Sequence, residues 1–298
     1  MKTKVKSTFL LFLTAIIWGF AFVAQRLGAE FVGAFTFNGI RFLLGSLSLI
    51  PVITIFEREK FDKSKFVKTL IPSIIAGVIL FIASTLQQLG VEWTGSAGKA
   101  GFLTGLYIVL VPVIRFFMGK KTSILTFFGA MFALVGLFFL CMTGDEMSFG
   151  KGDIVLIIGA FFWAAHILVV DKYVNNISPL KFSMMQFFIC GFLSIIFALS
   201  TETIELSAIK SAGIPILYGG LMSVGVAYTC QILGQKDADP TFASIVFSTE
   251  SVFSAVGGAI ILNEIMTGRG YLGCILIFIG IILSQLNFDS LTKFFKKS

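Results

Sequence analysis

Long apolar stretches separated by short polar segments dominate the chain. Ten of them come close to the roughly 20 residues that a helix needs to cross the hydrocarbon core of a membrane. They cover about residues 7–28, 34–56, 69–90, 97–117, 123–142, 153–174, 180–200, 212–234, 241–262 and 269–287. The alternation that marks a membrane β-strand is missing from them. The pattern therefore predicts an all-α integral membrane protein with ten transmembrane helices.

The two halves of the chain carry the same residues in the same order. Trp18 and Trp163 are 145 residues apart, and Arg41 and Gln186 each follow the tryptophan of their half by 23 residues. Further pairs, at an offset of 144 residues, are Gln87 with Gln231, Gly129 with Gly273, and Gly136 with Gly280. A near-constant offset at several places indicates an internal repeat. We divide the chain into a first repeat at residues 1–145 and a second at residues 146–298.

Each repeat contains five predicted helices, which is an odd number, so the second repeat must cross the membrane in the opposite orientation. Inverted five-plus-five repeats of this kind are typical of secondary transporters. In such proteins the substrate site lies near the middle of the membrane between the repeats, and access to it alternates between the two sides. The topology therefore favours transport by alternating access.

Composition and charge agree with a membrane location. Hydrophobic residues make up 56% of the chain and charged residues 13%, against about 25% charged residues in a soluble domain. The net charge of +7 is concentrated at both termini and in segment 57–68, which the topology puts on one side. By the positive-inside rule this side is the cytoplasm. The basic residues therefore predict cytoplasmic termini and contact with membrane lipid, and they argue against nucleic-acid binding.

Motifs for enzymatic or ATP-driven chemistry are missing from the sequence. It contains no GxxxxGK[ST] loop for phosphate binding and no HExxH spacing, and one histidine cannot form a histidine metal site. We therefore expect no catalytic residues, no metal and no cofactor. The cysteines lie in predicted helices without a CxxC spacing, and we expect buried free thiols at Cys141, Cys190, Cys230 and Cys274.

Three motifs lie in or directly beside the predicted helices: Trp18-Gly19, Arg41 within Asn-Gly-Ile-Arg-Phe, and the run 249–255 (Thr-Glu-Ser-Val-Phe-Ser-Ala) followed by 262–264 (Leu-Asn-Glu). They resemble motifs of EamA-type transporters of the drug/metabolite transporter superfamily. Ser251 stands where the family has proline, and Leu106 occupies the first-repeat position of Glu250, so the family motif is degenerate in the first repeat. The resemblance covers the whole chain. It implies a bacterial plasma-membrane transporter of a small metabolite, in a family whose substrates include amino acids, amines, nucleobases and toxic compounds.

Three ionisable residues in the predicted membrane segments are candidates for function, because such residues usually face a cavity or a partner. Glu250 is a candidate for contact with a substrate amine and for proton coupling, and its alternative is a structural hydrogen bond. Arg41 either binds a carboxylate or phosphate of the substrate or pairs with an acid such as Glu250. An ordinary histidine side chain titrates near neutral pH, so His166 is a candidate for proton transfer, with a packing role as its alternative.

The remaining candidates for substrate binding are neutral. Deep aromatic side chains can cover an apolar or cationic part of a ligand, and intramembrane amides can bond either the substrate or a neighbouring helix. These candidates are Trp18, Tyr107, Trp163, Gln87, Gln186 and Gln231. The two glycine pairs of the repeat lie on one face of their helices and suit close packing, within the chain or at a homodimer interface.

We therefore expect a secondary transporter that moves a small organic metabolite, such as an amino acid or an amine, with proton coupling through Glu250 or His166 as a hypothesis. An uncoupled facilitator or channel of the same fold is one alternative. A lipid-headgroup translocator is another, because a basic residue within the membrane such as Arg41 can bind phosphate.

Overall fold

The computed structural model describes residues 2–56, 63–95, 97–120, 122–141, 149–261 and 267–285. Within these ranges the chain is helical and contains no strand. The helices of the first repeat are α1 (Lys2–Ala29), α2 (Ala34–Phe56), α3 (Lys63–Thr94), α4 (Ala97–Gly105), α5 (Tyr107–Phe117) and α6 (Ile124–Cys141). Those of the second are α7 (Lys151–Tyr173), α8 (Pro179–Thr201), α9 (Leu206–Ser211), α10 (Gly213–Leu217), the π-helix η2 (Tyr218–Tyr228), α11 (Thr229–Gln235), α12 (Pro240–Phe247), α13 (Glu250–Ile261) and α14 (Gly268–Gln285).

These helices form ten apolar segments in the order that the hydrophobic pattern predicts. Eight are long and apolar enough to cross a membrane, and two shorter ones, Ile124–Leu140 and Gly268–Ser284, end each repeat. Large apolar side chains such as Phe192, Leu199 and Ile282 point away from the protein, as expected for surfaces that face lipid. The predicted all-α membrane fold is confirmed. Of the family motif, Leu262, Asn263 and Glu264 lie outside the described residues.

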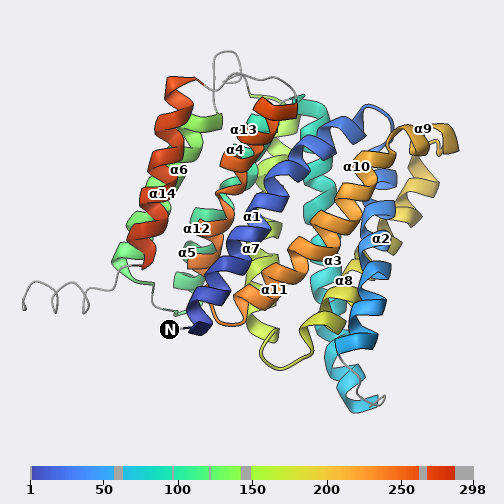
Figure 1. The fold of residues 1–298 in the computed structure, drawn as a ribbon, viewed down its shortest axis with the longest axis horizontal. Coiled ribbons are helices and arrows are strands. Elements are labelled where there is room, and N and C mark those ends of the chain that lie inside the picture. Colours follow the sequence, from blue (N-terminus) through green and yellow to red (C-terminus); the bar gives the residue numbers. More distant parts are fainter. Residues whose placement is uncertain are drawn as a thin grey trace, which may run out of the picture.

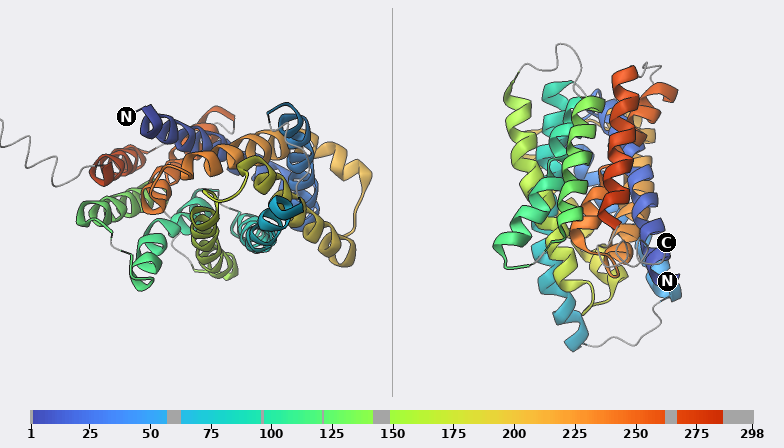
Figure 2. Two further views of the ribbon diagram at one scale, coloured as in Figure 1. Left: turned by 90° about the horizontal axis from the view of Figure 1, so that it is seen from below. Right: turned by 90° about the vertical axis from the view of Figure 1, so that its left-hand side faces the viewer.

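The bundle consists of two layers, and each layer combines helices of both repeats (Figures 1 and 2). One layer runs from α14 through α12–α13, α1 and η2–α11 to α2, and the other runs from α6 through α4–α5, α7 and α3 to α8. Each helix of one layer has its repeat equivalent in the other. We call the end of the bundle where α1 begins the inner end and the opposite end the outer end.

The packing of α6 against α14 shows that the repeats are inverted. A Cβ atom at Gly129 would lie 2.5 Å from the carbonyl oxygen of Gly280, and one at Gly136 would lie 2.6 Å from that of Gly273. The two contacts run in opposite directions along the two helices, which are therefore antiparallel. Because Gly129 is equivalent to Gly273 and Gly136 to Gly280, a pseudo-two-fold axis passes between them. The repeated glycines thus allow two equivalent backbones to approach closely.

The contact between α2 and α8 has the same symmetry. A Cβ atom at Gly191 would lie 3.1 Å from the carbonyl oxygen of Gly39, while the Ser46 hydroxyl donates to the Met184 carbonyl over 2.9 Å. At the offset of 145 residues, position 39 is equivalent to 184 and position 46 to 191. One pseudo-two-fold axis therefore passes through the α6–α14 contact at one edge of the two layers and through the α2–α8 contact at the other edge. Between these contacts it passes through the middle of the molecule.

Three of the predicted helices are discontinuous, which the hydrophobic pattern does not foresee. The stretch 97–117 is interrupted at Leu106, and the stretch 241–262 is interrupted between Phe247 and Glu250, which is the equivalent place in the second repeat. There the Ser248 and Thr249 hydroxyls each donate over 2.7 Å to a carbonyl three residues earlier. Such bonds compete with the regular helix ladder. The stretch 212–234 is divided into α10, η2 and α11, and its middle turns are π-helical.

Candidate functional site

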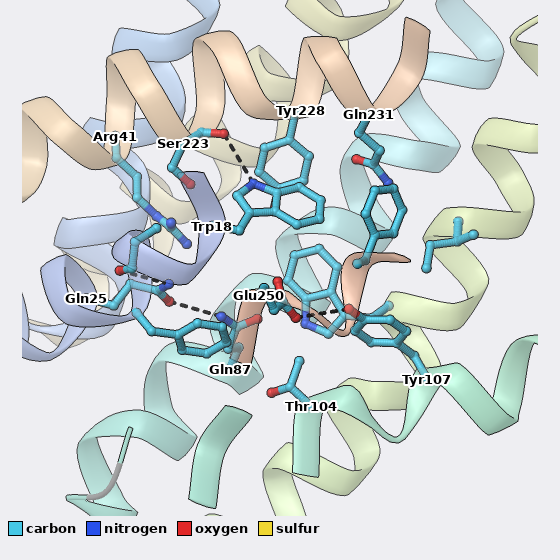
Figure 3. A pocket seen from close by; sticks show the side chains of 15 residues that line it. Trp18, Gln25, Arg41, Gln87, Thr104, Tyr107, Ser223, Tyr228, Gln231 and Glu250 are labelled. Carbon is cyan, nitrogen blue, oxygen red and sulfur yellow. Dashed lines mark hydrogen bonds between the residues drawn. The ribbon is translucent and has the colours of Figure 1, made fainter. Parts of the chain in front are cut away.

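A small enclosed cavity lies between the two layers near the middle of the bundle (Figure 3). Its walls come from both repeats and consist of Trp18, Ala21, Phe22, Gln25, Arg41, Gln87, Thr104, Tyr107, Trp163, Ile167, Ser223, Tyr228, Gln231, Phe247 and Glu250. The free volume of the cavity is about 30 Å³, which is roughly the share of one molecule in liquid water. The cavity combines aromatic rings, amides and two residues of opposite charge.

The aromatic part of the wall is built around Tyr228 and the two repeated tryptophans. The Tyr228 ring centroid lies 4.7 Å from that of Trp18 and 6.3 Å from that of Trp163, and the two tryptophan centroids are 6.5 Å apart. Phe247 adds a further ring, 5.4 Å from Trp18. The Trp18 indole donates to the carbonyl of Ser223 on η2 over 3.3 Å, which fixes the orientation of the ring (Figure 3).

Glu250 begins α13, at the break in the ninth membrane segment. The N–H groups of Ser251 and Phe253 in this first turn remain bonded to the Ser248 and Thr249 carbonyls, over 3.2 and 3.1 Å. The Tyr107 hydroxyl donates to Glu250 Oε1 over 2.9 Å, and both side chains are about 95% buried. The second carboxylate oxygen accepts no hydrogen bond from the described residues, so it remains available to a ligand (Figure 3).

Arg41 enters the cavity from α2. Its Nε donates to Asn38 Oδ1 over 2.9 Å, and the Asn38 amide in turn donates to the Ser84 carbonyl over 3.1 Å. The guanidinium carbon lies 4.8 Å from the ring centroid of Phe42, a favourable cation–π geometry. Among the described residues Arg41 has no carboxylate partner, so the pairing with Glu250 is not formed in this conformation. Its two terminal nitrogens donate to no described residue and are free for a ligand.

Amide side chains form a further part of the cavity wall. Gln87 Nε2 donates to Gln25 Oε1 over 3.2 Å, and Gln88 Nε2 donates to the Gln25 backbone carbonyl over 3.2 Å. Gln231, the repeat equivalent of Gln87, also lines the cavity, and its Oε1 has no partner among the described residues. The hydroxyl of Thr104 is buried without a described partner as well. These atoms leave hydrogen-bonding capacity for a polar ligand.

Two of the predicted candidates, His166 and Gln186, do not line the cavity. His166 Nε2 and Gln186 Oε1 are 2.9 Å apart and hydrogen-bonded, and both side chains are fully buried. The His166 ring stands edge-on to Tyr228 with the centroids 6.2 Å apart. The pair therefore lies behind the aromatic wall. The other predicted candidates, Trp18, Arg41, Gln87, Tyr107, Trp163, Gln231 and Glu250, all line the cavity.

Sequence reasoning missed some lining residues that helical spacing would have revealed. Tyr228 is three residues before Gln231, Thr104 is three before Tyr107, and Gln25 is seven after Trp18. Residues at these spacings share a helix face, so each lies on the face of a candidate that was recognised. The backbone carbonyl of Ser223 accepts the bond from Trp18, and the sequence carries no signal for such a contact.

Outside the cavity, the cysteines agree with the expectation of free thiols. Cys190, Cys230 and Cys274 form no disulfide, and Cys190 is fully buried as predicted, whereas the prediction of burial is wrong for Cys230 and Cys274, which are half-buried. The side chain of Cys141 lies outside the part of the chain that the structure describes.

Known proteins resemble this chain, two of those described here over nearly its full length. An uncharacterized transporter of Archaeoglobus fulgidus is 28% identical over 278 residues, which cover 92% of this chain and 84% of that protein. The uncharacterized transporter YoaV of Bacillus subtilis is 21% identical and covers 92% of this chain and 94% of its own length. A WAT1-related protein of Arabidopsis thaliana is 29% identical over 145 residues, which are 47% of this chain and 38% of that protein.

A solved crystal structure has the same fold. Its TM-score is 0.79 at 17% sequence identity, and the match covers 94% of this chain and 96% of that chain. The EamA-like transporter family model matches twice, at residues 5–142 and 150–286. These matches correspond to the two halves that the pseudo-two-fold axis relates. The chain therefore belongs to the EamA-like transporter family.

Proposed function

We propose that the protein is a secondary transporter that moves a small organic metabolite, an amino acid or an amine, across the plasma membrane by alternating access. One observation carries the proposal. Arg41 and Glu250 lie in the same buried cavity, between two inverted repeats, and each keeps atoms that no described residue satisfies. Charged groups at this depth are costly unless a partner or a ligand compensates them.

The chemistry of the cavity fits a substrate with both charges. The terminal nitrogens of Arg41 suit a carboxylate, which a guanidinium binds in a bidentate manner. The free oxygen of Glu250 suits an ammonium group, and the rings of Trp18, Trp163 and Tyr228 suit the apolar part or the cation itself. An amino acid satisfies both charged residues, whereas a simple amine satisfies Glu250 alone.

The size of the cavity favours alternating access over an open channel. A free volume of about 30 Å³ is far below the roughly 300–1,000 Å³ of pockets that hold organic ligands. The cavity must therefore widen to admit a metabolite, and the conformation described here offers no wide passage at this level. A transporter that opens to one side at a time meets this requirement.

Proton coupling belongs to the proposal as well. Glu250 is the better candidate, because it lies in the cavity wall, where loss or gain of its charge would directly change the binding of a cationic group. His166 is the second candidate and is separated from the cavity by the aromatic wall.

The proposal is tested by thermal-shift measurements on the purified protein with a metabolite library, followed by flux into proteoliposomes. A substrate should stabilise the wild-type protein, and Glu250→Gln should abolish both the stabilisation and proton-driven flux. Glu205→Gln, at an exposed acid on the outer surface, is the matched control and should behave as wild type. Unchanged flux in both Glu250→Gln and His166→Ala would overturn the assignment of the proton site.

Derivatives of the hit then decide which charges are recognised. A methyl ester keeps the ammonium group and removes the carboxylate, and an N-acetyl derivative does the reverse. Loss of binding by both indicates an amino acid, whereas binding of the ester indicates an amine. Stabilisation by phospholipid headgroups, with none by metabolites, would replace the proposal with lipid-headgroup translocation. Saturable uptake that never exceeds equilibrium, with or without a proton gradient, would indicate an uncoupled facilitator.

A further inference from the structure

A second group of buried polar side chains lies behind the cavity, on the side of the inner end. It consists of His166 on α7 with Ser183 and Gln186 on α8, and all three are fully buried. His166 Nδ1, Ser183 Oγ and Gln186 Nε2 have no hydrogen-bond partner in the described protein. Buried polar atoms without a partner are costly, and native proteins contain few of them. Several in one place indicate that water or a ligand occupies the site during part of the protein's cycle.

The internal symmetry shows what this group corresponds to. At the offset of 145 residues, His166 is equivalent to Ala21, Ser183 to Asn38, and Gln186 to Arg41. Ala21 and Arg41 line the cavity, and Asn38 holds Arg41 in place. Two members of the buried group, His166 and Gln186, are thus counterparts of cavity-lining residues in the first repeat, and Ser183 is the counterpart of the residue that holds Arg41.

The cavity therefore breaks the symmetry of the fold. It includes residues of α1 and α2 that lie toward the outer end, such as Gln25 and Arg41, and it leaves out their equivalents, Val170 and Gln186. An inverted-repeat protein opens to the other side when its two repeats exchange their conformations. After such an exchange the equivalent residues of the second repeat must form the wall.

We propose that His166 and Gln186 line the substrate cavity when the protein is open to the inner end, with Ser183 beside them toward that end, in the places that Ala21, Arg41 and Asn38 occupy in the present conformation. This inference rests on the proposed alternating access. It assigns to the site a second set of contacts, made by neutral donors and acceptors instead of a guanidinium. A substrate carboxylate is then held by the Arg41 charge from the outer side and by uncharged hydrogen bonds from the inner side, which bind an anion less tightly.

The direction of the path follows from the neighbouring helix ends. Ser183 lies near the beginning of α8, which starts at the same end of the bundle as α1 (Figure 1). Gln235 closes α11 at this end, and its Nε2 donates over 3.1 Å to the carbonyl of Ile167, the neighbour of His166. Its Oε1 has no partner among the described residues. Gln235 thus continues the polar group from His166 toward the inner surface.

Accessibility of single cysteines to a charged, membrane-impermeant thiol reagent tests the proposal. In a background without the four native cysteines, Ser183→Cys is compared with Phe182→Cys, and Gln186→Cys with Phe187→Cys. All four positions are fully buried in this conformation, and each pair is adjacent in sequence and equal in depth. Inside-out and right-side-out vesicles are labelled separately. Because labelling is irreversible, it accumulates even when the inner-open state is a minor population.

We expect Ser183→Cys and Gln186→Cys to be labelled from the inner end, at least about tenfold faster than their phenylalanine controls, because a thiolate forms and reacts only where water has access. The proposal would be overturned if each variant were labelled at the same rate as its phenylalanine-position control, or if labelling occurred from the outer end only.

The unsubstituted protein offers a second measurement that does not depend on the folding of variants. Hydroxyl radicals generated from water by brief X-ray exposure oxidise side chains that have water beside them. His166 should be modified, whereas Phe182, which is equally buried, should not. Absence of modification at His166 contradicts the proposal. Both measurements report water access and need no transport, so a protein that is labelled as expected but moves no metabolite would refute the proposed function and leave this inference about the second wall standing.

Discussion

At the scale of single residues, the two charges of the cavity are held in different ways. Arg41 is fixed by the Asn38 amide and by the face of the Phe42 ring, and neither of these groups carries a negative charge that would neutralise the guanidinium. Glu250 receives one hydrogen bond from Tyr107 and lies at the first turn of α13. Both residues are thus positioned by neutral groups, and each keeps its capacity to bind an ion. A salt bridge between them would have consumed that capacity.

The bond between Tyr107 and Glu250 leads to a prediction about stability. Tyr107→Phe removes the hydroxyl and keeps the ring, so the buried carboxyl loses its described donor. We expect the free energy of unfolding to fall by about 1–3 kcal/mol and transport to decrease. Thermal unfolding in detergent measures the first effect. The same substitution at the exposed Tyr271 on α14 is the control, and equal unfolding temperatures for the two variants would show that the bond contributes nothing.

At the scale of helices, α8 and α2 are joined at the outer end by one carboxylate. Glu202 accepts hydrogen bonds from the backbone N–H groups of Phe35 and Thr36, each over 2.8 Å, and from the Thr36 hydroxyl over 2.6 Å. The first N–H groups of α2 have no partner within the helix and favour an anion. Glu202, which directly follows α8, therefore caps the helix that carries Arg41.

Removal of this cap should loosen the pair of helices. Glu202→Ala is expected to lower the free energy of unfolding by about 1–2 kcal/mol, as for the loss of other helix caps. Glu205→Ala, three residues further along and exposed, should have little effect. Chemical denaturation of both variants in the same detergent makes the comparison, and a smaller loss for Glu202→Ala than for Glu205→Ala would contradict it.

The contact between α6 and α14 leaves no room for side chains. A Cβ atom at Gly280 would lie 2.5 Å from the Gly129 carbonyl oxygen and 3.1 Å from the Ala133 Cβ. Gly280→Ala should therefore force the helices apart and cost about 1–3 kcal/mol, the usual range for overpacking. At Gly268, the first residue of the same helix, no atom lies within 4 Å of such a Cβ. Gly268→Ala should unfold close to the wild-type temperature, and a similar loss in both variants would show that close packing is not the cause.

The hydrophobic pattern was sufficient to predict the number and order of these helices but not their interruptions. Apolar length reports that a segment prefers the membrane, and it does not report whether the backbone ladder is continuous. At the break before Glu250 the Ser248 and Thr249 hydroxyls bond carbonyls of their own turn, but Ser48 and Ser84 make the same bond within continuous helices. From the sequence alone, Ser248 and Thr249 cannot be distinguished from small polar residues within a continuous helix. The separate helix α9 has only six residues, and the pattern gave no signal for it.

At the scale of the whole molecule, the sequence repeat predicted the inverted architecture and part of the cavity wall. Trp18, Trp163, Gln87 and Gln231 line the cavity in equivalent pairs. The repeat could not predict that Arg41 would face the cavity while its equivalent Gln186 would not. That difference belongs to the conformation that the molecule adopts, and two equivalent positions in a sequence carry no information about which of them is in contact with the site.

The same symmetry indicates which helix contacts persist when the protein changes state. The contact of α2 with η2 is equivalent to the contact of α8 with α3, where Gly77 packs against Ile189. Because both contacts are already formed, the α2–η2 contact is kept when the repeats exchange conformations. The contact of α1 with α13 differs between the repeats. Gly257 on α13 is buried, and a Cβ there would lie 3.3 Å from Val23 Cγ2, whereas its equivalent Val113 on α5 is 36% exposed. We infer that this contact breaks when the repeats exchange conformations.

Two disulfides distinguish these contacts. In the cysteine-free background, Ser48→Cys with Gly225→Cys joins α2 to η2, where the Cβ atoms would be 3.8 Å apart, the mean distance in disulfides. Val23→Cys with Gly257→Cys joins α1 to α13. The α1–α13 disulfide should stop flux into proteoliposomes, and a reductant should restore it, because the bond locks a contact that must open. The α2–η2 disulfide should leave flux unchanged. If the α1–α13 disulfide forms and flux continues, α1 and α13 move as one body, and the change of access must take place elsewhere in the bundle.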